Sequence, residues 1–213
     1  MAEQGKHQDI ELMLWGDFDL ENATDAERAS FAKAYRFSTL YHVDRLRKSR
    51  ESFYRHDCRC AARALKAGFG LIVAIIMMIH EFIEDDGWTR RKIARIFGKL
   101  VAAVVDAISK RQKSNFHSRQ ARLDDHIARM RKIIPLYWHV AVAKVLDRYD
   151  NVTDTAALSD EDKLRLFDET EKFFLPLFYE STEFVPPEHH DFYVYIVQEI
   201  EFACDNFNQS QAW

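Results

Sequence analysis

Apolar residues recur every three to four positions along most of this chain, the spacing that places them on one face of an α-helix. The first such segment follows Thr24 and Glu27, which have the spacing of a capping box, and it predicts a helix from Thr24 to near Leu46. The same spacing predicts further helices around residues 61–65, 93–97, 101–109, 123–134, 136–151, 159–177 and 192–202.

One segment, residues 69–79, contains no polar side chain at all. This pattern predicts a helix that is buried on all sides. The segment is too short to cross a bilayer, which needs about 20 apolar residues, so no membrane span is expected. The polar stretch that follows at once is His80-Glu81-Phe82-Ile83-Glu84-Asp85-Asp86.

This polar stretch raises the question of what compensates its charges. If the helix continues, His80 lies beside Glu84 and Glu81 beside Asp85, because side chains three or four positions apart share a face. Leaving one partner of a buried charged pair unpaired costs about 2–5 kcal/mol, so positive charge is expected among these groups. A metal ion is the simplest source of that charge.

Composition agrees with the helical pattern. The chain has 213 residues, of which 47% are apolar, and this is enough to bury the core of one domain. Its six Gly and four Pro residues supply little of the turn chemistry that β-hairpins need, so we expect an all-α fold. We expect a short arm over residues 1–23 and a single domain over residues 24–213.

Charge and cysteine content narrow the class of protein. A formal net charge of −4 argues against a nucleic-acid-binding protein, whereas the basic segment 45–50 suits a phosphate-bearing small molecule. Three cysteines without a secretory signal indicate a reducing cytoplasm. Cys58 and Cys60 have no second ligand pair after them and diverge on a helix, so we do not expect them to bind metal. The oligomeric state is left open.

Three separated polar groups are each attached to an apolar helix: His56, the doublet His80-Glu81, and Asp147. Each of them alone has an ordinary structural explanation. Together, two imidazoles and two carboxylates form a ligand set that suits a divalent ion with positions left open for water. Asn151 lies four residues after Asp147 and therefore points the same way.

These residues also carry a resemblance to a known family. Their order resembles the H, HD and D of the HD-superfamily phosphohydrolases, and longer segments are similar to the RelA/SpoT-type (p)ppGpp hydrolases. Residues 47–56 resemble that family's RKSGEPYIVH motif, residues 80–85 its HDxxED motif, residues 88–110 its helix pair ending in VSK, and residues 147–151 its DRLHN motif. The resemblance covers roughly residues 35–155 and implies an HD-domain-like helical bundle.

The resemblance implies a role for each motif residue. The implied ligands of a manganese ion, Mn²⁺, are His56, His80, Glu81 and Asp147. The implied catalytic residues, which position or deprotonate water and assist the leaving oxygen, are Glu84 and Asp85. The implied nucleotide-binding residues are Arg47, which stacks on the base, and Lys48, Ser49 and Asn151. The implied reaction is hydrolysis of the 3′-pyrophosphate of a (p)ppGpp-like nucleotide to pyrophosphate and GDP or GTP.

The chain departs from the family pattern in a few places. Glu81 is longer by one methylene than the family's aspartate, Arg50 and Ser52 replace a Gly and a Pro, and Asp154 stands where Thr is common. These changes point to a different substrate preference. The chain ends at Trp213, without room for the synthetase and regulatory domains of the long family members, which favours a small stand-alone hydrolase.

Two other functions remain open from the sequence. One is a catalytically silent domain that binds a nucleotide or a protein partner, for which the change at Glu81 is the motive. The other is an HD-type phosphohydrolase that acts on another nucleotide, such as (p)ppApp. The presence of both Glu84 and Asp85 favours an enzyme over a binding module, because a binding module needs no pair of water-activating carboxylates.

Overall fold

The computed structural model describes residue 20 and residues 23–211. In that part the chain is helical, and its β-type pairing is limited to an isolated antiparallel bridge between Leu46 and Ser52. The α-helices are α2 (Asp25–His42), α3 (Phe53–Lys66), α4 (Leu71–Ile79), α5 (Arg90–Phe97), α6 (Lys99–Ile108), α7 (Arg119–Ile133), α8 (His139–Thr153), α9 (Asp160–Glu169), α10 (Leu175–Ser181) and α11 (His190–Gln211). Shorter helical segments are η1 (Lys113–Asn115), η2 (Thr170–Phe174), η3 (Thr182–Phe184) and η4 (Pro187–His189).

The predicted all-α class is confirmed by this architecture. The predicted arm over residues 1–23 lies almost entirely outside the described residues, so the domain boundary proposed there stays a prediction. Buried side chains from α2 through α11 belong to one hydrophobic cluster. None of the helices in the described part is both long and apolar enough to span a membrane.

Side-chain caps fix where several helices begin. The predicted capping box is present: the Thr24 hydroxyl accepts a hydrogen bond from the Glu27 backbone N–H, and the Glu27 carboxylate accepts one from the Thr24 backbone N–H. Side chains cap four further helices in the same way, and these caps are Ser52, Thr89, Ser118 and Ser159. The first helix ends at His42 and not near Leu46, because the chain reverses direction over residues 46–52.

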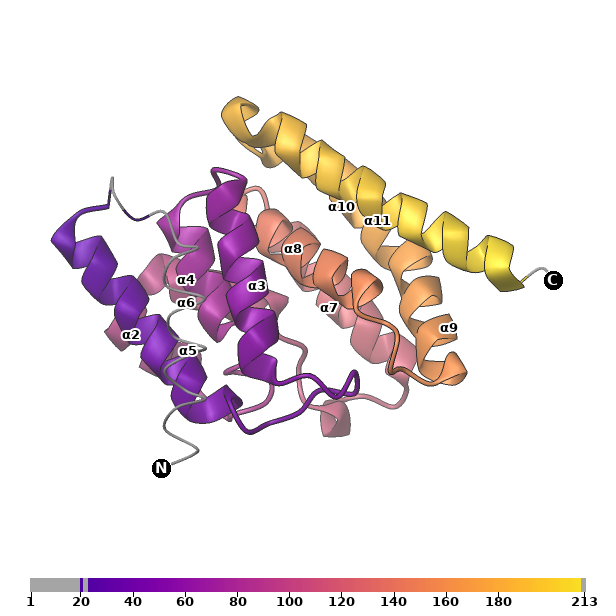
Figure 1. Ribbon diagram of the computed structural model, residues 1–213, viewed down its shortest axis with the longest axis horizontal. Helices are drawn as coiled ribbons and strands as arrows, with labels where there is room; N and C mark the ends of the chain where they lie inside the picture. The colour runs from indigo at the N-terminus through magenta and orange to yellow at the C-terminus, as the bar shows by residue number, and fades with distance from the viewer. Residues whose placement is uncertain (1–19, 21–22, 212–213) are drawn as a thin grey trace.

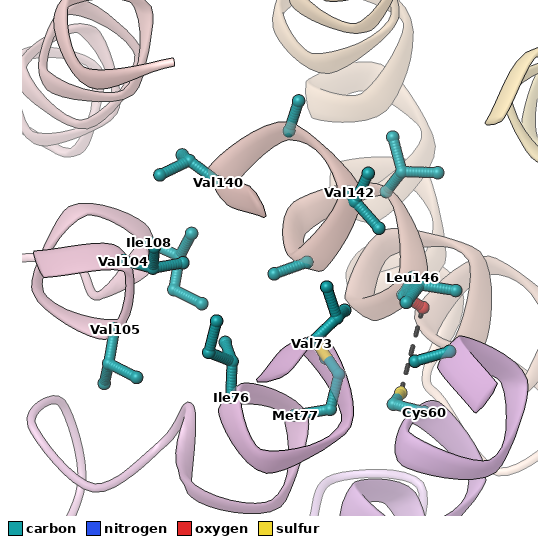
Figure 2. Close-up of a cluster of buried hydrophobic side chains, with 14 of the residues drawn as sticks. Cys60, Val73, Ile76, Met77, Val104, Val105, Ile108, Val140, Val142 and Leu146 are labelled. Atoms are coloured by element: carbon teal, nitrogen blue, oxygen red, sulfur yellow. Dashed lines mark hydrogen bonds between the residues drawn. The ribbon is translucent and has the colours of Figure 1, made fainter. Parts of the chain in front are cut away.

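Helix α4 lies at the centre of the core. It contacts α2, α3, α6 and α8 (Figure 1). Its residues are buried from Val73 to Ile79, as the apolar run predicted, whereas Ile72 in its first turn is 44% exposed. Figure 2 shows side chains of α4 packed between α6 and α8, and the labelled residues of the three helices are Val73, Ile76, Met77, Val104, Val105, Ile108, Val140, Val142 and Leu146.

The aromatic C-terminal third of the chain covers α8. Helix α11 is the long helix along one side of the molecule in Figure 1, and it packs on α8 and α10. Its buried side chains follow a helical period and include Tyr193, Ile196, Val197, Ile200 and Cys204. Because α11 covers one side of α8 and α4 another, α8 can hold charged side chains away from water.

Helices α9 and α10 are joined by η2, a π-helical segment over Thr170–Phe174. The backbone N–H of Leu175 donates to the carbonyl of Thr170, five residues earlier. Pro176 follows at the start of α10 and has no N–H to donate, which favours a local departure from α-helical pairing. The segment places Phe174 in the core beneath α8.

A buried polar bridge joins α2, α3 and the turn after α4. His42 Nδ1 lies 2.6 Å from an Asp57 carboxylate oxygen, and its Nε2 lies 2.7 Å from an oxygen of Asp86. Ser38 donates to the same Asp57 oxygen, and Arg45 donates to Asp86. Burial lowers the pKa of His42, but the hydrogen bonds and charges of both carboxylates outweigh burial and raise that pKa above its ordinary value.

We expect the variant His42→Gln to lose stability most strongly at low pH. The folded pKa of His42 lies above its unfolded value of about 6.5, so its stabilisation is fully present below that pH and is lost as pH rises through the folded pKa. Breaking such a buried pair costs about 3–5 kcal/mol. Thermal unfolding of parent and variant between about pH 6 and pH 9 tests whether the Tm difference shrinks on raising the pH.

The matched control is His117→Gln, which changes an exposed loop histidine. Its Tm difference from the parent is expected to stay near zero at every pH. A Tm difference for His42→Gln that does not change with pH contradicts a charged His42 bridge.

Candidate metal centre and adjoining cleft

The four predicted metal ligands come together in the structure. His56 lies in the first turn of α3, His80 and Glu81 lie directly after the last residue of α4, and Asp147 lies on α8. Each offers one atom, and these four atoms all lie within 4.8 Å of one another. Three elements far apart in the sequence therefore deliver two imidazole and two carboxylate groups to one point.

The ring nitrogens that face this point are acceptors. His80 Nδ1 donates to the Met77 carbonyl at 2.7 Å, and His56 Nδ1 donates to Asp150 at 2.7 Å, since a carbonyl or carboxylate oxygen only accepts. In a neutral ring, Nε2 then carries a lone pair. The two Nε2 atoms lie 3.2 Å apart, and an Asp147 oxygen lies 3.4 Å from His56 Nε2. Such convergence of acceptors requires positive charge between them.

The pKa values of His80 and Asp147 also indicate that positive charge is needed between the four side chains. Burial lowers the pKa of His80, but the negative charges of Glu81 and Asp147 outweigh burial and raise that pKa well above its ordinary range. Burial raises the pKa of Asp147, but the charge of Lys144 and the two histidines outweigh it and hold that pKa well below its usual range. Either protons or a metal ion can supply the positive charge that the four side chains need, and their ligand types fit a divalent metal.

Glu81 reaches the group in spite of its extra methylene. Its carboxylate oxygen lies 3.4 Å from His80 Nε2. Burial raises the pKa of Glu81, but the charge of His80 outweighs burial and lowers it below the usual range. The change from the family's aspartate therefore leaves a carboxylate at the point where the other three ligands meet.

Cys60 lies beside the four predicted ligands but is not expected to be a fifth metal ligand. With His56 and Asp150 it forms a second cluster of three possible ligand atoms. However, His56 Nδ1 carries a proton toward Asp150, and Asp150 is already bonded to two arginines, Arg59 and Arg63. A metal in that position would have to displace these bonds, which agrees with the prediction against cysteine ligation.

The polar stretch after α4 forms turns, so the prediction that its residues continue the helix is wrong. Helix α4 ends at Ile79, where the Phe82 N–H donates to its carbonyl, and a single bond from the Asp85 N–H to the Glu81 carbonyl at 2.8 Å follows. That bond still holds Glu81 and Asp85 side by side. At the start of the stretch the His80 ring donates to the Met77 carbonyl.

Asp85 and Glu84 have different surroundings. Burial, and then the negative charges of Glu81 and Glu84, raise the pKa of Asp85 to about 7. The Glu84 carboxylate accepts hydrogen bonds from the Lys110 backbone N–H at 2.9 Å and from Arg122 at 3.1 Å. Both carboxylates line the cleft beside the four ligands.

A cleft of about 350 Å³ opens onto the ligand group. Its wall includes all four residues predicted to bind a nucleotide, and these are Arg47, Lys48, Ser49 and Asn151. Arg47 donates to the Asn151 side-chain oxygen, and Asn151 in turn donates to Asp147 at 2.7 Å. Lys48 points to Asp162 at 2.6 Å, and the buried Ser49 hydroxyl has no hydrogen-bond partner among the described residues.

Two buried cations on α8 were not predicted. Lys144 lies 2.7 Å from Asp147, and Arg148 packs over the Phe174 ring with its guanidinium carbon 3.8 Å from the ring centroid. Both are more than nine-tenths buried and line the cleft. Lys144 and Arg148 could have been identified from the sequence as cationic residues inside an apolar helix, because such residues need a buried partner or an anionic ligand.

A second cavity of about 490 Å³ shares a wall with the cleft. Its lining contains one acidic residue, Glu169, and six basic residues, which are Lys48, Lys110, Lys113, Arg119, Arg122 and Arg165. This cavity thus presents mostly positive charge beside the cleft, whose own wall mixes basic and acidic side chains. An anionic ligand such as a phosphate ester suits this surface.

Comparison with known proteins finds relatives named as guanosine bis(diphosphate) pyrophosphohydrolases and GTP pyrophosphokinases. No protein-family model matches the chain. A probable guanosine-3′,5′-bis(diphosphate) 3′-pyrophosphohydrolase of Synechocystis sp. is 27% identical over 179 residues, which is 79% of this chain and 24% of that protein. The GTP pyrophosphokinase rsh of Brucella ovis is 25% identical over 153 residues, which is 72% of this chain and 20% of that protein. The chain spans about a quarter or less of these relatives' length.

A solved structure has a similar fold. It is described as a metazoan ortholog of SpoT that hydrolyzes ppGpp and plays a role in starvation responses, and it matches with a TM-score of 0.59 and 14% identity. The match covers 86% of this chain and 96% of that one. The predicted helical bundle is shared with this structure, and the curated relatives confirm the resemblance to RelA/SpoT-type proteins.

We expect divalent metal to stabilise the protein through the four ligands. At a metal concentration 100 times Kd, binding adds about 2.7 kcal/mol to the free energy of unfolding, or roughly 5–10 °C in Tm. Glu81→Gln removes one ligand charge and is expected to abolish most of this shift. Thermal unfolding with and without Mn²⁺ after chelator treatment measures the effect.

The control for this comparison is Asp168→Asn, which removes an exposed carboxylate paired with Lys172 on the surface. It is expected to keep the shift of the parent. A Glu81→Gln variant that is stabilised by Mn²⁺ as strongly as the parent shows that Glu81 does not hold the ion.

Proposed function

We propose that this chain hydrolyses the 3′-pyrophosphate of (p)ppGpp-like nucleotides and releases pyrophosphate with GDP or GTP. The observation that carries the proposal is the position of the group formed by His56, His80, Glu81 and Asp147. It adjoins a cleft whose remaining wall carries seven basic and five acidic side chains. The activities named for the Synechocystis relative and for the metazoan structure support the choice of substrate.

We propose Mn²⁺ as the ion that His56, His80, Glu81 and Asp147 hold. The choice of manganese follows the family resemblance, whereas the four ligand types suit several divalent metals. When bound, such an ion lowers the pKa of a water molecule and neutralises phosphate charge. Lys144 is bonded to the second oxygen of Asp147, which leaves the first oxygen directed at the histidines.

The cationic residues bind and orient the substrate. Arg47 presents a planar guanidinium, 12% exposed at its side chain, that suits stacking on a base. Lys48, Ser49 and Asn151 lie next to it in the cleft wall and bind the sugar and phosphates. Arg148 is positioned to neutralise phosphate charge, because it lines the cleft beside Asp147.

Hydrolysis needs a group that accepts a proton and a group that donates one. Water adds to the phosphorus bonded to ribose O3′, the P–O3′ bond breaks, the water loses a proton, and O3′ gains one. Asp85 lies beside Glu81 in the cleft wall, is not one of the four ligands, and therefore serves as the carboxylate that accepts the water proton. Glu84, bonded to Lys110 and Arg122, positions the cationic side of the cleft and assists the leaving oxygen.

The direct test is incubation of the purified protein with ppGpp, with Mn²⁺ or with chelator, and chromatography of the products. We expect pyrophosphate and GDP in equal amounts, with Mn²⁺ only. A parallel incubation with ppApp tests the alternative base. Failure to convert either nucleotide, together with nucleotide binding, favours the catalytically silent domain instead.

We expect Asp85→Asn to lower kcat by about 10²–10⁴, because an amide keeps the shape but takes no proton. Glu84→Gln is expected to lower kcat as well. Both variants should keep the parent's affinity for Mn²⁺, since neither residue belongs to the four ligands. Steady-state kinetics and metal titration measure the two quantities separately. Loss of metal from Asp85→Asn, or turnover equal to the parent, contradicts the assigned roles.

A further inference from the structure

Asp150 connects the metal ligands to the nucleotide side of the cleft. It lies on α8, is 1% exposed, and faces α3. One of its oxygens lies 2.7 Å from His56 Nδ1 and 3.5 Å from an Arg47 guanidinium nitrogen. A single buried carboxylate oxygen is therefore shared by a proposed metal ligand and the proposed base-stacking arginine.

The same carboxylate is held in place by α3. Arg59 donates to both of its oxygens, at 2.8 Å and 2.7 Å, and Arg63 donates to the first of them. Arg59 and Arg63 lie one turn apart, and His56 lies one turn before Arg59, so all three share a face of α3. The bidentate bond to Arg59 fixes the plane of the carboxylate as well as its position.

The first consequence concerns the His56 ring. Its imidazole is fully buried, and its Nδ1 donates to Asp150, so Nε2 is the nitrogen that faces the other metal ligands. His80 is oriented differently, through a neutral backbone carbonyl at Met77. His56 is therefore the proposed histidine ligand whose Nδ1 donates to a carboxylate, whereas the nearest carboxylate oxygen to His80 Nδ1, on Asp57, is 3.6 Å away.

The second consequence concerns Arg47. One of its guanidinium nitrogens faces Asp150, and another donates to Asn151, whose amide donates to Asp147. Arg47 therefore reaches the ligand group along two paths, one through Asp150 to His56 and one through Asn151 to Asp147. Arg47 is thus held by one hydrogen bond, to Asn151, and by a longer ion pair with Asp150.

We propose that Asp150 is a positioning residue that supports metal binding at His56 and nucleotide binding at Arg47 at the same time. The inference rests on the proposed function and adds a residue to it. The family motif matched by residues 147–151 has a histidine at this position, so the carboxylate is a feature of this chain. The hydrogen bonds and charges of Arg59 and Arg63 offset the cost of removing the Asp150 carboxylate from water.

The test compares Asp150→Asn with Asp154→Asn. Asp154 also lies near Arg47 and Arg59, with each nearest nitrogen 3.9 Å away, and has no recorded bond to His56. Isothermal titration of chelator-treated protein with Mn²⁺, without nucleotide, is expected to give a Kd that is about 10–100 times larger for Asp150→Asn than for the parent. Asp154→Asn is expected to keep the Kd for Mn²⁺ within about a factor of two.

Titration with GDP in the absence of metal reports on Arg47. Asp150→Asn is expected to weaken GDP binding as well, because Arg47 loses the charge of its buried ion-pair partner 3.5 Å away. An Asp150→Asn variant with the parent's Kd for Mn²⁺ overturns the inference. So does a variant that weakens Mn²⁺ binding and leaves GDP binding unchanged, since the residue then serves His56 alone.

Arg63→Gln separates positioning from general packing. It removes one bond to Asp150 and leaves the bonds to His56 and Arg59. Its Tm is expected to fall while its Kd for Mn²⁺ stays within about three times that of the parent. A Kd that rises as far as in Asp150→Asn shows that lost packing, and not the bond to His56, weakens the metal site.

A measurement on the parent protein decides the matter if Asp150→Asn does not fold. Nitrogen-15 NMR of the Zn²⁺-loaded protein is expected to show His56 with its proton on Nδ1 and none on Nε2. The reverse tautomer overturns the inference. Failure of the proposed function is distinct, because it appears as a parent protein that does not convert ppGpp, whatever the state of Asp150.

Discussion

The structure depends on how the charges of four buried side chains, His56, His80, Glu81 and Asp147, are compensated where they meet. Two imidazole nitrogens and two carboxylate oxygens repel one another unless positive charge lies among them. Around them the protein supplies fixed partners, with Lys144 on the far oxygen of Asp147 and the Met77 carbonyl behind His80. The helices α3, α4 and α8 must therefore be held firmly against each other, and the apolar contacts in Figure 2 do this.

The helical pattern gave the elements of the fold well, because each helix reveals its buried face in its own sequence. The apolar run of α4, the cap at Thr24 and the separated polar groups on α3, α4 and α8 were all visible in this way. The end of α4 at Ile79 was not visible, and in the structure the His80 ring donates to the Met77 carbonyl at this point. The sequence motifs predicted which side chains lie together, whereas the distances between these side chains could only be obtained from the structure.

Partners across helices were the part that the sequence did not reveal. His42 meets Asp57 and Asp86, and Asp150 meets Arg59 and Arg63, at separations set only by how the helices pack. A period of 3.6 residues says which face is buried and does not say which polar group lies opposite. Buried charges without a local partner, such as Arg148 within the apolar α8, are the remaining sequence sign of such contacts.

The π-helical segment η2 limits how this chain can change in length. It inserts one extra residue into the turn between α9 and α10, so that Phe174 lies beneath Arg148 while Arg165 and Glu169 line the cleft. The wide π turn absorbs this residue, whereas a residue added to or deleted from the regular turns of α9 or α10 rotates one part of the helix by about 100° relative to the other. Insertions and deletions between related sequences are therefore expected to avoid the regular turns of α9 and α10 and to accumulate in the loops of the chain.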